Sequence, residues 1–103
     1  MSLPETLLLV NAVIDPAIEA EWNRWYNEKH LPEIVNCPGF RAGARYVAED
    51  EAGGRRYIAI YELDGPEALN SAEFNARRGW GSFADKVRFQ TARFSRIAQA
   101  GGA

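Results

Sequence analysis

The sequence has little of what most catalytic and metal-binding motifs require. Its 103 residues include one cysteine, Cys37, and one histidine, His30. A single cysteine excludes an internal disulfide and suits a reducing compartment, so we expect a cytoplasmic protein in which Cys37 is a small buried hydrophobic residue. Without a second histidine, a cysteine pair or a carboxylate cluster at ligand spacing, we expect no metal site.

The sequence also lacks long apolar runs and cofactor motifs. The apolar stretch LLLVNAVI, residues 7–14, is too short to span a bilayer, and no cationic segment precedes it as in a signal peptide. No G-x-G-x-x-G segment occurs, and only the segment around His30 offers a possible haem ligand. The net charge of −2 presents no basic field to nucleic acid. We therefore expect no cofactor, no nucleic acid partner and no membrane partner.

Charge is distributed unevenly along the chain. Residues 1–33 carry six acidic and two basic residues, whereas residues 77–96 carry six basic residues and one acidic residue. A basic run on a strand is most often a solvated face, and an anion-binding site is the alternative interpretation.

The order of apolar stretches and turns predicts a β-α-β-β-α-β chain. Residues 7–14 indicate a buried strand. Asp15 and Pro16 suit the start of a helix, which Pro32 is expected to end or kink. Strands are expected at residues 41–49, 55–63 and 87–98, with a second helix at about residues 67–78. This order is typical of the α+β class: a ferredoxin-like unit with a four-stranded antiparallel sheet and two helices on one face, here as a single domain over residues 1–103.

Both faces of the predicted sheet are apolar, which two helices on one face cannot cover. The first strand places Leu8, Val10, Ala12 and Ile14 on one side and Leu7, Leu9 and Val13 on the other. A bare face would expose several hundred Å² of apolar surface. Burying it is worth about 25 cal/mol per Å², which favours a homodimer with sheet facing sheet.

A longer motif carries a family resemblance. The segments WYNEKHLPEI, NCPGFRAGARY and RRYIAIYEL follow one another along the chain. Their W-Y…H-L-P…P-G-F string resembles the EthD-like branch of the dimeric α/β-barrel superfamily over nearly the whole chain. The resemblance implies a homodimer whose two sheets close a barrel, with a cavity between the sheet and the first helix. It implies no single reaction, since relatives include cofactor-free monooxygenases, isomerases, cyclases and heme-handling proteins, and many EthD-like members have no assigned activity.

His30 is the candidate catalytic residue. Trp22 and Tyr26 lie at the centre of an apolar helical stripe, and a helical wheel puts His30 at its edge, one turn beyond Tyr26. An imidazole with an ordinary pKa of about 6.5 can transfer a proton at neutral pH. The alternative is that His30 hydrogen-bonds a loop carbonyl and holds the turn into Pro32.

The candidate substrate-binding residues come from several elements: Asn11, Trp22, Tyr26, Tyr61 and Trp80. Asn11 and Tyr61 are expected to orient a carbonyl or hydroxyl, and the other three to form apolar wall. Trp22 also fits a plain core position, and Trp80 fits either the barrel mouth or the dimer seam. In the second strand either Arg45 or Tyr46 faces inward, because neighbours alternate.

These features together favour one functional hypothesis and one rival. The first is a homodimeric, cofactor-free enzyme that performs acid–base chemistry, of the isomerase, cyclase, decarboxylase or monooxygenase type, on a small apolar or aromatic metabolite. The rival is a non-catalytic dimer that binds a small molecule or serves as an accessory protein in a catabolic pathway.

Overall fold

A central apolar strand organises the sheet in the computed structural model, which describes residues 3–102. Strand β1 (Thr6–Ile14) lies between β3 (Arg55–Leu63) and β4 (Val87–Ser95), and β2 (Phe40–Glu49) forms the edge beyond β3. All neighbouring strands are antiparallel. The predicted α+β, ferredoxin-like sheet is confirmed, although β4 ends at Ser95 rather than at residue 98.

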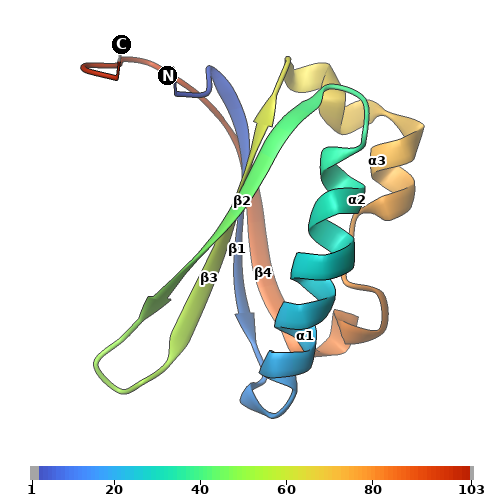
Figure 1. Cartoon of the computed structure of the whole chain (residues 1–103), viewed down its shortest axis with the longest axis vertical. Helices are drawn as coiled ribbons and strands as arrows, with labels where there is room; N and C mark the ends of the chain where they lie inside the picture. Colours follow the sequence, from blue (N-terminus) through green and yellow to red (C-terminus); the bar gives the residue numbers. More distant parts are fainter. Residues whose placement is uncertain (1–2, 103) are drawn as a thin grey trace.

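The two faces of the sheet have different surroundings (Figure 1). The helices lie on one face, where Leu8, Val10, Ala12 and Ile14 are buried. The side chains of Leu7, Leu9 and Val13 alternate with these and lie on the open face, which the chain leaves uncovered. The alternation predicted for β1 is therefore confirmed.

The first helical segment is longer and less regular than expected. After Asp15, whose carboxylate accepts a 2.9 Å hydrogen bond from the Ala17 amide, it runs through η1 (Pro16–Ile18), α1 (Glu19–Trp25), a π-helical turn η2 (Tyr26–His30) and α2 (Leu31–Val35). The expectation that the helix could end at Pro32 was wrong, because the segment continues to Val35. Within the π turn the Leu31 amide bonds to the Tyr26 carbonyl, and this wider turn fits a proline that has no amide hydrogen to donate.

The second helical segment is broken where one helix was predicted. A 3-10 turn η3 (Pro66–Asn70) is followed by α3 (Ala72–Arg77). Ser71 separates them, since its hydroxyl accepts a 3.0 Å hydrogen bond from the Phe74 amide and starts a new helix. A further turn, η4 (Gly81–Lys86), leads into β4.

The core lies between the sheet and the first helical segment and is rich in aromatic rings. Trp22 is fully buried and Tyr61 is 1% exposed. Cys37 is buried, as expected for a small hydrophobic residue. No helix within residues 3–102 is long and apolar enough to cross a bilayer. The cytoplasmic location stays a prediction.

Candidate functional site

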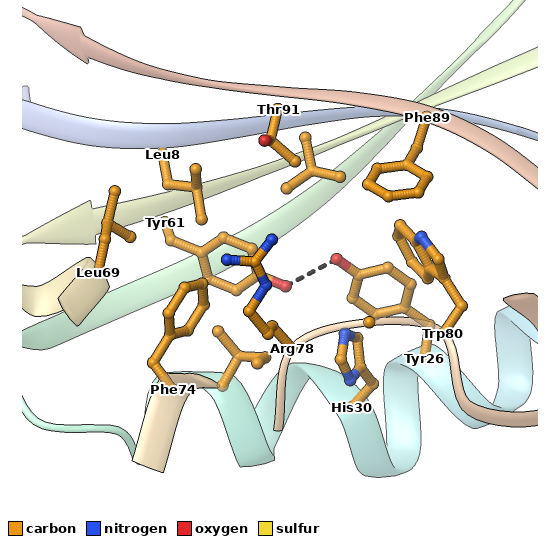
Figure 2. Close-up of a pocket in the computed structure, with 13 residues that line it drawn as sticks. Leu8, Tyr26, His30, Tyr61, Leu69, Phe74, Arg78, Trp80, Phe89 and Thr91 are labelled. Carbon is orange, nitrogen blue, oxygen red and sulfur yellow. Dashed lines mark hydrogen bonds between the residues drawn. The ribbon is translucent and has the colours of Figure 1, made fainter. Parts of the chain in front are cut away.

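A cavity of about 150 Å³ lies between the covered face of the sheet and the first helical segment (Figure 2). Side chains from β1, β3 and β4 form one wall, and side chains from η2, α2, η3, α3 and the loop before η4 form the other. The lining is mainly apolar, and its polar side chains are Tyr26, His30, Tyr61, Arg78 and Thr91. A cavity of this size is comparable to an engineered protein cavity that binds benzene.

The π turn determines which helical side chains reach this cavity. Trp22, Tyr26, His30 and Ile34 are spaced four residues apart, and all are buried. On a regular α-helix each step of four residues rotates the side chain by about 40°, so the series would leave the buried face. The π turn at Tyr26–His30 contains one more residue than an α-helical turn, which opposes that rotation. The side chains of the four residues therefore continue to face the sheet. The helical wheel placed His30 at the edge of the apolar stripe, but in the structure His30 lies on the buried face.

His30 is packed among aromatic rings and faces the cavity. It is 5% exposed, and its ring stacks on Trp25 with centroids 4.6 Å apart. The pKa of His30 is lowered to about 4, mainly by burial; the Glu33 carboxylate opposes this shift and nearby Arg45 adds to it. The imidazole is thus neutral at pH 7. Within residues 3–102 it makes no hydrogen bond to a loop carbonyl, so the structure gives no support to the turn-anchor alternative.

A pair of tyrosine hydroxyls lies next to the imidazole. The Tyr26 and Tyr61 hydroxyl oxygens are 2.7 Å apart, and either can donate to the other. Burial raises the pKa of both tyrosines above the ordinary value. Both hydroxyls therefore keep their protons, and the mutual hydrogen bond uses one of the two. The other O–H can donate to an oxygen atom of a ligand.

Arg45 packs behind the tyrosine pair and does not line the cavity. Its guanidinium lies 4.1 Å from the centroid of the Tyr26 ring. It donates hydrogen bonds of 2.6 Å to Asn27 Oδ1 and 2.9 Å to Asn23 Oδ1. Arg45 therefore faces the helices, while Tyr46 lies on the open face with 52% of its surface exposed. This resolves the alternative left open by strand alternation.

The sequence-predicted site residues do not all meet in the cavity. Four of them line it: Tyr26, His30, Tyr61 and Trp80. Trp22 lies behind this wall, with its ring centroid 5.7 Å from that of Tyr26 and 5.9 Å from that of Trp80. Asn11 lies on the open face and is exposed, because its neighbours Val10 and Ala12 face the helices. The structure therefore keeps Asn11 out of this cavity.

Sequence reasoning missed several lining residues, namely Phe74, Arg78, Phe89 and Thr91. Phe89 and Thr91 are two residues apart in β4, and both side chains lie on the covered face of the sheet. This period of two was missed because the strand is basic and most of it is exposed. Phe74 was missed because the break at Ser71 changes the phase of the second helical segment. No group of three or more His, Cys, Asp or Glu side chains in the described range could hold a metal ion.

Comparisons with known sequences identify a family and one curated relative. The family model described as "Domain of unknown function (DUF4286)" matches residues 5–100. "Core atranone cluster (CAC) protein 1" of Stachybotrys chlorohalonatus is 31% identical over 87 residues, a match that covers 78% of this chain and 37% of that protein. The chain thus spans little more than a third of the length of the curated relative that it matches.

Solved structures with the same fold are more distant in sequence. A mutant of SnoaB, a cofactor-independent oxygenase from Streptomyces nogalater, aligns with a TM-score of 0.67 and 15% identity over 92% of this chain and 96% of that one. An EthD family protein from Bacillus halodurans aligns with a TM-score of 0.65 and 14% identity over 84% and 96%. A dimeric ferredoxin-like protein from an uncultured marine organism aligns with a TM-score of 0.64 and 10% identity over 95% and 100%. The expected EthD-like resemblance is confirmed at the level of the fold.

Proposed function

The chain belongs to the DUF4286 family of unknown function, and we propose that it is a homodimeric enzyme that transfers protons on a small aromatic or apolar metabolite without a cofactor. The observation that carries the proposal is the cavity in which a neutral imidazole lies beside a protonated hydroxyl pair. The printed descriptions of the neighbours support it, since one is a cofactor-independent oxygenase and the curated relative is named after the atranone cluster.

The proposed step uses two groups with separate roles. The neutral imidazole of His30 accepts a proton from a carbon next to a substrate carbonyl, and the C–H electron pair moves into an enolate. The spare hydroxyl proton of the Tyr26–Tyr61 pair donates a hydrogen bond to the developing oxyanion. Return of the proton to the same carbon gives exchange with solvent hydrogen. In a β,γ-unsaturated carbonyl compound, the protonated imidazole instead delivers the proton to the γ-carbon of the dienolate, and the double bond shifts into conjugation with the carbonyl, so that the isomerisation gains and loses no atom. The aromatic wall around His30 and Trp80 excludes water and strengthens these interactions.

Hydrogen–deuterium exchange tests this chemistry without a known substrate. The protein is incubated in D₂O with a panel of aryl ketones and aryl β-keto esters, and NMR follows exchange at the carbon next to the carbonyl. We expect the wild-type protein to accelerate exchange of at least one compound. His30→Gln is expected to abolish the acceleration, and Tyr26→Phe to reduce it by about 10- to 1000-fold. Equal rates in the wild type and His30→Gln would contradict the proposed base.

The rival function, binding without chemistry, has one observation in its favour. A pKa of about 4 makes the imidazole of His30 a weak base, and general bases work best with a pKa near the operating pH. A protein that binds aryl ketones tightly but never accelerates their exchange would be a binder. The same D₂O experiment, combined with a binding titration, therefore separates the two functions.

The open face of the sheet supports the homodimer in this proposal. Val13 is 40% exposed, Tyr46 52% and Phe94 50%, all on the face without helices. An apolar groove of about 540 Å³ runs across the same face, lined in part by Leu7 and Ile60. Exposed apolar area of this kind marks an interaction surface, and one solved neighbour is described as dimeric.

Two adjacent residues of β2 provide a matched test of the dimer. Tyr46 pairs with Ile58 on the open face, whereas Val47 pairs with Tyr57 on the helix side, and the two are 52% and 50% exposed. We expect the wild type to sediment at twice the 11.5 kDa chain mass. Tyr46→Glu should shift it toward the monomer, and Val47→Glu should not. A wild-type monomer at micromolar concentration would refute the dimer.

A further inference from the structure

The basic segment of the chain contributes a charge to the cavity that the proposed proton transfer does not use. Residues 77–96 carry six basic residues and one acidic residue, and Arg78 from this segment lines the cavity. Because His30 is neutral at pH 7, Arg78 is the one permanently charged side chain in the described lining. Figure 2 shows the Arg78 side chain among those that line the cavity.

Several arginines near the helices have no carboxylate partner within residues 3–102, and Arg78 is the one of these that lines the cavity. Within residues 3–102 its side chain forms no ion pair or hydrogen bond, and its guanidinium carbon lies 5.8 Å from the centroid of the Phe74 ring. By contrast, Arg41, Arg55 and Arg96 each pair with a carboxylate. The N–H donors of Arg78 are therefore available to a ligand, and the Phe74 ring restricts where the cation lies.

The backbone beside Arg78 directs its neighbours to the same cavity. Gly79 has a backbone φ angle of 106°, which residues other than glycine rarely adopt. No atom lies within 4 Å of the position that a Cβ would take there, so the backbone angle and not lack of space requires the glycine. On either side of this bend, Arg78 and Trp80 both line the cavity.

We propose that Arg78 recognises a carboxylate of the ligand, so that the substrate class is a small aromatic or enolisable carboxylate. This inference rests on the proposed function, because it assigns the substrate of the same cavity. A guanidinium matches a carboxylate through two parallel hydrogen bonds, and the apolar walls accept a ring-sized body. The negative charge of Glu33 opposes the lowering of the His30 pKa. The same charge disfavours a ligand anion beside the imidazole and so favours one at Arg78.

A pair of isosteric ligands tests the charge recognition directly. Benzoate and benzamide are titrated against the 103-residue chain, with tryptophan fluorescence as the signal because Trp80 lines the cavity. We expect the wild type to bind benzoate about 10- to 100-fold more tightly than benzamide, as expected for hydrogen bonds to a charged group. Arg78→Gln should remove the preference by weakening benzoate alone. Arg78→Lys should retain part of it, since one of the two parallel bonds is lost.

A control variant with the same change in charge tests whether the benzoate preference depends on Arg78 itself. Arg24→Gln removes the same charge from an exposed residue of α1 outside the cavity and should keep the benzoate preference. A preference that survives in Arg78→Gln, or is missing from the wild type, overturns the role of Arg78 and leaves the proton-transfer proposal standing. If neither ligand binds to the wild type, the carboxylate proposal fails, and the D₂O exchange experiment decides the proton-transfer proposal separately.

Discussion

The single histidine provides a sharp test of the site, because every imidazole signal of the protein belongs to His30. Burial lowers the pKa of His30 from 6.5 to about 4 in the folded protein. An unfolded chain protonates the same imidazole near the ordinary value of about 6.5. Between these values the unfolded state binds more protons than the folded state, so the free energy of unfolding decreases as the pH falls.

The size of this effect follows from the change in pKa. One pKa unit corresponds to about 1.4 kcal/mol. Linkage therefore predicts that the free energy of unfolding falls by about 2 kcal/mol between pH 7 and pH 5, and by about 3 kcal/mol at pH 4. Below pH 4 the imidazole is protonated in both states, and its contribution stops changing. The stabilising effect of the neutral imidazole is therefore complete only above about pH 6.5.

Urea denaturation at pH 7, 6 and 5 measures the loss, with His30→Gln as the reference. Carboxylates titrate in both proteins, so the difference between the two pH profiles isolates the imidazole. We expect the wild type to lose about 2 kcal/mol more than the variant between pH 7 and pH 5. Parallel profiles, or an NMR pKa of 6 or higher, would refute the buried, neutral imidazole. Glu33→Gln should lower the NMR pKa further, because it removes the charge that opposes the shift.

Further changes test the packing around the site. Gly43→Ala is expected to destabilise the fold by about 1–3 kcal/mol, because a Cβ would lie 2.8 Å from a ring carbon of Tyr61; unchanged stability in urea would contradict this close packing. Tyr26→Phe and Tyr61→Phe should each cost about 1–3 kcal/mol and the double variant less than the sum, whereas additive losses would argue against a coupled pair. Arg45→Gln should raise the NMR pKa of His30, and a lower value would contradict the electrostatic cause.

The strands were predicted well because their signals are local. β1 is a short, nearly continuous run of apolar, mostly branched residues, β3 is rich in isoleucine and tyrosine, and the polar DEAGG segment between β2 and β3 marks the hairpin. Helix boundaries were predicted less well. Ser71 starts a new helix inside an expected one, and Pro32 does not end the first helical segment, although a π turn interrupts the α-helix just before it. At both positions a single hydrogen-bonding choice outweighs the average preference of the segment.

The candidate site was predicted in part, for a similar reason. Tyr26 lies at the centre of an apolar helical stripe, so its burial follows from the pattern, whereas the sequence left the place of Trp80 open between the barrel mouth and the dimer seam. The hydroxyl bond between Tyr26 and Tyr61 joins residues 35 positions apart and depends on how the helix docks on the sheet. Asn11 was predicted in the cavity from its polarity alone, and polarity cannot tell which face of a two-sided apolar strand it occupies.

The sequence by itself determined the order of the elements and the two-sided apolar character of the central strand, because those depend on neighbours along the chain. The tertiary structure decided how His30 turns inward at the π turn, which face of β2 carries Arg45, and that Arg78 reaches the cavity. Each of these depends on the docking of distant segments, where a rotation of a few tens of degrees separates a surface residue from a buried one. The chemistry proposed for the protein depends on those rotations more than on residue type.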